Sequence, residues 1–194
     1  MIIGLTGKSC AGKDAVAALL DKKRFEVIDV DKLGHDALAM NKDKLVEAFG
    51  DGIIAQDGSV DRKVLGPLVF SDPDKLGTLN SITHPWMHDE AIRRAEEAER
   101  EGKDAVINAA LLESMGFVES CDRIILVVAG YETRLKRALQ RDSGMTEEKF
   151  RDRTMAQKDV GLSLFGSGRP VFTIINDEGF DSLSRQVMFL CDRL

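Results

Sequence analysis

The sequence predicts an α/β protein built on a doubly wound, five-stranded parallel sheet with helical insertions. Short apolar runs recur along the 194 residues, separated by stretches with helical character. The run at residues 122–128 is almost entirely apolar, as expected for a strand covered on both faces. The first run passes directly into a glycine-bounded loop and then a helix. Alternation of this kind favours right-handed crossovers and a ligand at the carboxyl ends of the strands.

The order of elements follows from the apolar runs and the residues that punctuate them. The predicted strands are residues 2–5, 25–30, 104–108, 122–128 and 171–175. The predicted helices are residues 15–20, 32–39, 85–100, two consecutive helices within 132–159, and 182–194. Because no internal repeat or low-complexity tract interrupts this series, we expect a single domain over 1–194.

Composition excludes several classes of protein. A formal net charge of −6 and a pI near 5.2 argue against a protein that binds nucleic acid through bulk charge. The three cysteines, Cys10, Cys121 and Cys191, are too scattered for a disulfide framework or a zinc cluster. No basic leader and no apolar run of about 18 residues is present, so no signal peptide or membrane span is expected. We therefore expect a cytoplasmic protein without membrane or nucleic-acid partners.

The clearest motif lies between the first strand and the first helix. It reads Gly7-Lys-Ser-Cys-Ala-Gly12-Lys13, the G-x-x-x-x-G-K pattern of a phosphate-binding loop. Glycines permit the tight turn, N–H groups point at phosphate oxygens, and Lys13 supplies a full charge. The alternative is a glycine-rich turn that only joins strand to helix. The expected nucleotide-binding residues of the loop are Gly7, Cys10, Ala11, Gly12, Lys13, Asp14 and Ala15.

The second strand ends in a carboxylate, Asp31, which the parallel-sheet rule places on the ligand-binding edge. A general base is one interpretation of Asp31, and the N-cap of the next helix is the other. On position alone the two stay open.

Residues 41–101 carry no strong strand signal apart from a weak one at 52–55, and Pro85 is well placed to open a long helix. Sixty mostly helical residues are more than an ordinary crossover connection between two strands needs, so we expect an inserted subdomain that binds substrate. His84 and His88 share a helical face, but a third metal ligand is lacking nearby, which disfavours a metal site.

Residues 132–159 are net positive in a net negative chain, with Arg134, Arg137 and Arg141 at helical spacing. Guanidinium groups suit phosphate oxygens, and helices hinged at Ser143-Gly144 could close over a nucleotide. An ordinary charged helical hairpin is the alternative. Together with the phosphate loop, the segment favours a small-molecule kinase; the N-K-x-D of guanine-reading GTPases is absent.

At this point the chain resembles the dephospho-coenzyme A kinase family over nearly its whole length. The blocks that carry the resemblance are Ile3-Gly-Leu-Thr-Gly with Ala11-Gly-Lys13, Val27-Ile-Asp-Val-Asp31, Asp57-Gly-Ser-Val-Asp-Arg62, Val69-Phe-Ser-Asp72, Leu79-Asn-Ser-Ile-Thr-His-Pro85, Leu111-Leu with Glu113, Arg134-Leu-Lys-Arg137 with Arg141, Arg153 through Gln157, and Ile175-Asn176. The most specific are the Leu-Asn-x-Ile-x-His-Pro and Asp-x-Asp blocks.

The resemblance implies transfer of the ATP γ-phosphoryl group to the 3′-hydroxyl of dephospho-CoA, with Mg²⁺ as the metal. It implies a CoA-binding subdomain at 35–100 and a lid at 132–159. The catalytic residues would be Asp31, Lys13, Arg137 and Arg141, with Asp31 as the base. Asn176 would lie near the adenine, and Asp31, Arg62 and His84 would bind the acceptor. Weak self-association is left open.

The chain departs from the family at two positions that concern the metal. Asp14 follows the loop lysine where the family usually has serine, and Asn108 ends the third strand where the family usually has aspartate. One hypothesis is that the carboxylate has moved, making Asp14 a metal ligand. The other is an Asp that merely stabilises a helix N-terminus. The functional alternatives are a weakened relative that binds nucleotide or CoA, and a kinase for another small alcohol.

Overall fold

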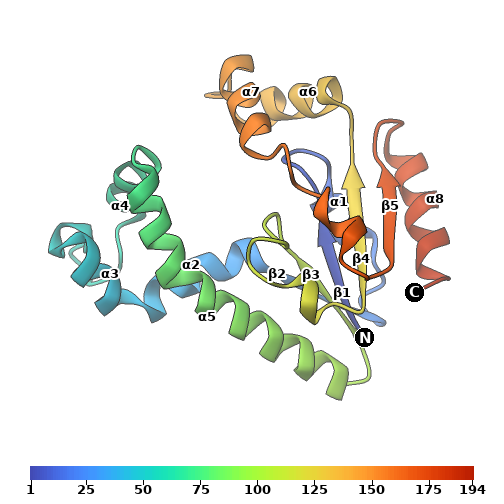
Figure 1. Cartoon of the computed structure of the whole chain (residues 1–194), viewed down its shortest axis with the longest axis horizontal. Helices are drawn as coiled ribbons and strands as arrows, with labels where there is room; N and C mark the ends of the chain where they lie inside the picture. Colours follow the sequence, from blue (N-terminus) through green and yellow to red (C-terminus); the bar gives the residue numbers. More distant parts are fainter. The chain divides into compact units, whose positions relative to one another are not determined.

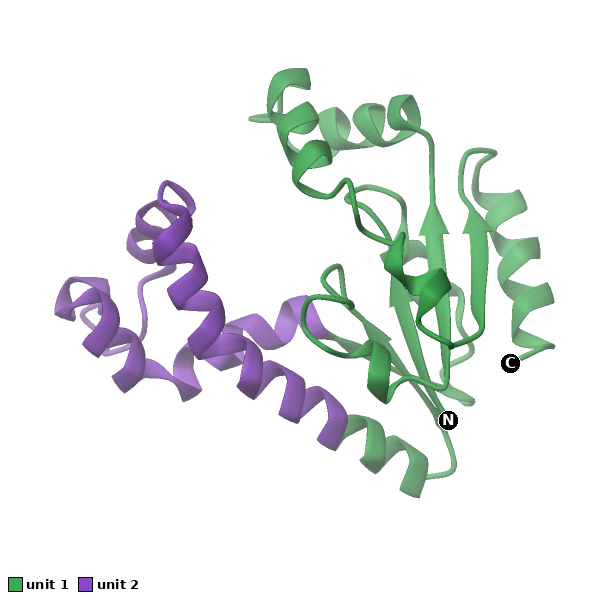
Figure 2. Cartoon of the chain, in the orientation of Figure 1, with its two compact units in different colours: residues 1–29, 94–194 green, residues 30–93 purple.

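The computed structural model describes residues 1–194, which form two compact units (Figure 2). The first unit contains residues 1–29 and 94–194, and the second contains residues 30–93. No helix combines the length and the hydropathy that a membrane-spanning segment needs.

The first unit is built on a five-stranded sheet in which every pairing is parallel (Figure 1). Its strands are β1 (Ile2–Thr6), β2 (Phe25–Asp29), β3 (Asp104–Asn108), β4 (Arg123–Val128) and β5 (Val171–Ile175). Their order across the sheet is β2-β3-β1-β4-β5, which confirms the predicted α/β fold. Asn108 pairs in register with Leu5 on one side and Asp29 on the other, so β1, β2 and β3 end close together.

Alternation along β1 distributes its side chains to the two faces of the sheet. Ile3 and Leu5 are fully buried in the core that contains residues of α1 (Lys13–Leu19) and α8 (Phe180–Cys191). Gly4 points the other way, where a Cβ would lie 2.7 Å from Leu112 and 3.0 Å from Cys121. The residues after β3 therefore pack directly on the backbone of the central strand.

Three further elements of the first unit follow β4. They are α6 (Tyr131–Arg141), α7 (Glu147–Ala156) and the short 3-10 turn Ser163–Gly166. A second 3-10 turn, Val118–Ser120, precedes β4. Leu135 and Ala138 of α6 form a small core with Met145 and Phe150, which holds α6 and α7 together.

The second unit is helical. Its elements are α2 (Val30–Met40), α3 (Lys42–Phe49), a 3-10 turn (Asp51–Ile53), α4 (Arg62–Phe70) and most of α5 (Pro73–Arg100), which continues into the first unit. Leu45, Ile53, Leu65 and Val69 are each at most 2 % exposed and form its own core.

Two sequence predictions about this helical region were wrong. The long helix begins at Pro73 instead of Pro85, because Asp72 caps it through the N–H groups of Asp74 and Lys75, and proline suits the first helical position. Pro85 lies inside the helix, which continues although proline lacks an N–H. The weak strand at 52–55 is absent, since Ile54 makes only one isolated bridge, to Val60.

Candidate functional site

The loop between β1 and α1 has the geometry that its glycines predict. Gly12 has φ +106°, in the left-handed region that favours glycine. At Gly7 a Cβ would lie 2.3 Å from the carbonyl oxygen of Val127, so only glycine fits against β4. The N–H of Ala11 donates to the carbonyl of Lys8 at 3.0 Å and closes the turn. The loop thus curls into the start of α1 at the carboxyl end of the central strand, where phosphate-binding loops lie.

Cys10 is the one non-glycine residue with a positive φ, +63°. Its side chain is half-buried and packs on the small core of α6 and α7. A strained backbone of this kind persists only where the surroundings hold it. The loop is therefore fixed in shape by the segment that follows β4.

Arg137 and Asn176 connect the loop to the end of β5 through hydrogen bonds. One Arg137 nitrogen donates to the carbonyls of Cys10 and Ala11, each at 3.3 Å. The other donates to the carbonyl and side-chain oxygen of Asn176, at 2.8 and 3.2 Å. Asn176 in turn donates to the Ala11 carbonyl at 2.8 Å and is 5 % exposed. Both residues were predicted to serve the site, and the structure brings them onto the loop backbone.

Arg134 was not among the predicted site residues, yet it supports the same loop. It is 5 % exposed, donates to the carbonyls of Ala129 and Ser9, and lies over the ring of Phe150. Burial lowers the pKa of Arg134 from its ordinary value. The signal in the sequence was its spacing of three from Arg137, which places both guanidinium groups on one face of α6.

The end of the α7 segment also contacts the loop. The side-chain oxygen of Gln157 accepts from the N–H of Ser9 at 2.8 Å, and Lys8 donates to the carbonyl of Lys158 at 3.0 Å. Sequence reasoning missed both contacts, because nothing local marks partners that lie 148 and 150 residues away. The segment after β4 therefore contacts the loop from Lys8 to Ala11.

Asp14 and Asn108 meet beside Lys13. Asn108 donates from its side-chain nitrogen to the Asp14 carboxylate at 3.2 Å, and the Lys13 ammonium lies 3.6 Å from the same oxygen. Burial would raise the pKa of Asp14, but the hydrogen bond from Asn108 and the charges of Lys13 and Arg141 lower it overall. Arg141 ends α6, and its charge is one of the causes that lower the pKa of Asp14.

The side-chain oxygen of Asn108 has no hydrogen-bond partner, although the residue is 3 % exposed. The hydroxyl of Thr6, fully buried at the end of neighbouring β1, also lacks one. Buried oxygens without a donor are unusual in proteins and call for an explanation. One of them lies at the end of β1, from which the phosphate loop departs, and the other at the end of β3, which pairs with β1.

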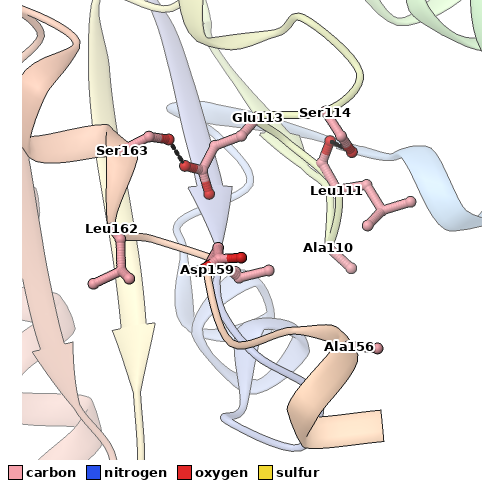
Figure 3. A pocket seen from close by; sticks show the side chains of 9 residues that line it. Ala110, Leu111, Glu113, Ser114, Ala156, Asp159, Leu162 and Ser163 are labelled. Carbon is pink, nitrogen blue, oxygen red and sulfur yellow. Dashed lines mark hydrogen bonds between the residues drawn. The ribbon is translucent and has the colours of Figure 1, made fainter.

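A cavity of about 500 Å³ lies between the residues that follow β3 and residues 156–163. Figure 3 shows Leu111 and Leu162 among its lining side chains, and Glu113 turned toward Ser163. The Glu113 carboxylate accepts from the Ser163 hydroxyl and, at 2.8 Å, from the N–H of Gly161. Glu113 thereby fixes the chain between α7 and β5 to the chain that follows β3.

Three of the predicted residues belong to the second unit. Asp31 lies in the first turn of α2, which begins at Val30, so it is not the N-cap of that helix. Arg62 opens α4 after the capping residue Asp61. His84 is half-buried in α5, and burial lowers its pKa. No group of three or more His, Cys, Asp or Glu side chains is arranged to hold a metal ion.

Comparison with known proteins identifies the family. The model of the dephospho-CoA kinase family matches residues 1–161. A dephospho-CoA kinase of Geobacter sulfurreducens is 38 % identical over 160 residues, which cover 80 % of this chain and 81 % of the relative. A solved structure from Thermus thermophilus superposes with a TM-score of 0.77 at 29 % identity, covering 100 % of this chain and 97 % of that one.

A dephospho-CoA kinase structure from Campylobacter jejuni superposes with a TM-score of 0.74 over 99 % of this chain and 96 % of its own; at 21 % identity this likeness supports the fold. The matched region contains the phosphate loop, Asp31, and the arginines of α6. On the family model and the curated relatives together, the chain belongs to the dephospho-CoA kinase family.

Proposed function

We propose that this protein transfers the γ-phosphoryl group of ATP to the 3′-hydroxyl of dephospho-CoA, giving coenzyme A. The observation that carries the proposal is the formed phosphate loop, whose carbonyls are held by Arg137 and Asn176. A merely glycine-rich turn would not need side chains from α6 and from the residue after β5 to set its shape. Membership of the family supplies the substrate class. We further propose that the reaction takes place in the cytoplasm.

The first unit would hold ATP. The loop N–H groups and Lys13 would bind the β- and γ-phosphates, and Asn176, just past β5, would lie beside the adenine. Since Arg137 donates all its described bonds to loop and Asn176 oxygens, we assign it to keeping the loop in shape. Arg141, whose charge acts on Asp14, would neutralise charge on the transferring group.

The second unit would hold the acceptor. We propose residues 35–100 as the CoA-binding subdomain and residues 132–159 as the lid. Asp31, at the start of α2, would accept the proton of the 3′-hydroxyl. Arg62 would bind acceptor phosphates as a cation on α4, and His84, held neutral by the burial that lowers its pKa, would contribute a hydrogen bond.

Magnesium fits the residues beside Lys13. The Asp14 carboxylate and the unpaired Asn108 oxygen are both hard oxygen donors of the kind that Mg²⁺ takes. When bound, the ion would neutralise charge on the β- and γ-phosphate oxygens.

The test is a mass-resolved assay with purified protein, ATP and dephospho-CoA, run with Mg²⁺ and separately with Mn²⁺. We expect a product heavier by one phosphoryl group. Lys13→Met should lower kcat at least about 100-fold, because the lysine stabilises charge in the transition state. Lys22→Met, an exposed lysine outside the loop, is the matched control and should retain full activity.

Two other outcomes would contradict the proposal. Saturable binding of ATP or CoA without product under either metal would indicate a binding protein that has lost catalysis. Phosphorylation of another small alcohol in preference to dephospho-CoA would indicate a different substrate.

A further inference from the structure

We propose that Asp14 and Asn108 are an exchanged pair of metal-binding side chains. In phosphate-loop kinases the metal is held by a hydroxyl after the loop lysine together with an acidic residue at the end of a neighbouring strand. Here the carboxylate stands on the loop, and the strand end carries the neutral amide. The proposal rests on the proposed kinase function and concerns which residues of this chain hold the ion.

The contact between the two side chains is the first support. Asn108 ends β3 beside β1, and its side-chain nitrogen reaches the Asp14 carboxylate at 3.2 Å across 94 residues of sequence. If the two positions had departed from the arrangement in phosphate-loop kinases independently of each other, nothing would require the carboxylate of Asp14 and the amide of Asn108 to form a hydrogen bond. Two carboxylates at this separation would instead repel each other. The exchange keeps one negative charge at the site.

The unpaired oxygen of Asn108 is the second, independent support. Its nitrogen is used by Asp14, while its oxygen is buried without any donor in a residue 3 % exposed. A purely structural asparagine would be expected to satisfy both ends of its amide. An oxygen that lacks a hydrogen-bond donor is suited to a cation or to a water molecule bound to it.

The ligand count suits magnesium in particular. No group of three or more acidic, histidine or cysteine side chains is present, so the chain offers no complete metal cage. Mg²⁺ in kinases is bound by one or two protein side chains, with substrate phosphates and water completing the shell. Two-thirds of the Asp14 side chain is exposed, which leaves it accessible to such a ligand set.

The competing interpretation gives Asp14 only the role of a negative charge at the start of α1. Asp181 provides a matched control, because it is the acidic residue in the first turn of α8 and lies outside the site. If Asp14 acts only on its helix, Asp14→Ser and Asp181→Ser will change thermal stability alike and leave the metal dependence of ATP binding unaltered.

The experiment is a double-mutant cycle read out by ATP binding in the presence of Mg²⁺, Mn²⁺ or EDTA. We expect Asp14→Ser to weaken binding of ATP with Mg²⁺ at least 10-fold, or about 1.4 kcal/mol, while binding in EDTA changes less than 3-fold. Adding Asn108→Asp to Asp14→Ser returns the carboxylate to the strand and should restore the metal-dependent affinity to within about 3-fold of the wild type.

The single change Asn108→Asp adds a readout without nucleotide. The substitution places two carboxylates in contact, so the melting temperature of this variant in EDTA should be lower than that of the wild type. Addition of Mn²⁺ should raise the melting temperature of the variant by more than it raises that of the wild type. Equal affinity of Asp14→Ser and the double variant for Mg²⁺ and ATP would overturn the exchange. That result is distinct from failure of the kinase function, in which the wild type itself yields no product.

Discussion

Gly12→Ala tests whether the phosphate loop is fixed by contact with Asn176, the residue after β5. Gly12 has φ +106°, and an added Cβ would lie 2.1 Å from the Asn176 side-chain nitrogen. The left-handed backbone alone costs alanine about 1–2 kcal/mol. Displacing the Asn176 side chain also breaks the hydrogen bond that it donates to Ala11 and the one that it accepts from Arg137, each worth about 0.5–1.5 kcal/mol. The free energy of unfolding should therefore fall by about 3 kcal/mol, within a range of about 2–5.

Gly102→Ala is the matched control in the same unit. Gly102 has φ +77° but nothing within 4 Å of an added Cβ, so it should lose only the backbone contribution of about 1–2 kcal/mol. In a chain of this size about 1 kcal/mol corresponds to about 2–4 °C in melting temperature. Calorimetry should thus find decreases of about 6–12 °C for Gly12→Ala and about 3–6 °C for Gly102→Ala.

A third variant identifies the cause. In an Asn176→Ala background the obstructing side chain is gone, so Gly12→Ala should cost no more than Gly102→Ala. If Gly12→Ala costs the same with and without Asn176, or the same as Gly102→Ala in the wild type, the collision is not the reason for glycine at this position.

Two other predictions concern residues around the site. Glu113→Gln replaces one of two acceptor oxygens by a donor that faces the N–H of Gly161 or the hydroxyl of Ser163. The substitution should lower the free energy of unfolding by about 1–3 kcal/mol and speed proteolysis within residues 156–166. Glu119→Gln, at an exposed position, is the control, and equal cleavage of the two variants would contradict the role of Glu113. Burial raises the pKa of the Cys121 thiol to about 12, so the free energy of unfolding should decline as the pH rises above the ordinary thiol pKa toward 12. Iodoacetamide at pH 8.5 should alkylate half-buried Cys10 well before Cys121. Equal labelling rates of the two thiols would refute this expectation.

The strands could be predicted from the sequence because each signal is local. All five apolar runs match the observed bounds within one residue: those of β3 and β5 coincide with the strands, β1 and β2 differ by one residue at their ends, and β4 begins one residue later than its run. The phosphate loop was predictable for the same reason, since its glycines and lysine lie within seven residues. The contact of Asp14 with Asn108 agrees with the family pattern, in which these two positions concern the same metal ion.

What could not be predicted depends on distant partners or on a choice between similar signals. Pro73 and Pro85 each suit the first turn of a helix, and only the capping bonds of Asp72 identify the actual start. The contact of Ser9 with Gln157 leaves no trace in either local sequence. Arg134 was visible as part of a basic face, but its burial against Phe150 depends on how α6 and α7 pack.

The bond from Asn176 to Ala11 joins residues 165 apart, and this has a consequence for synthesis on the ribosome. The strand β1 emerges well before β3 and β4, the two strands with which it pairs. The last side chain that fixes the loop belongs to the residue after β5, the final strand of the sheet to be made. Contacts this distant in sequence slow folding. The most recognisable motif of the chain therefore leaves the ribosome well before the residues that complete its shape, and it is among the last segments to acquire its final form.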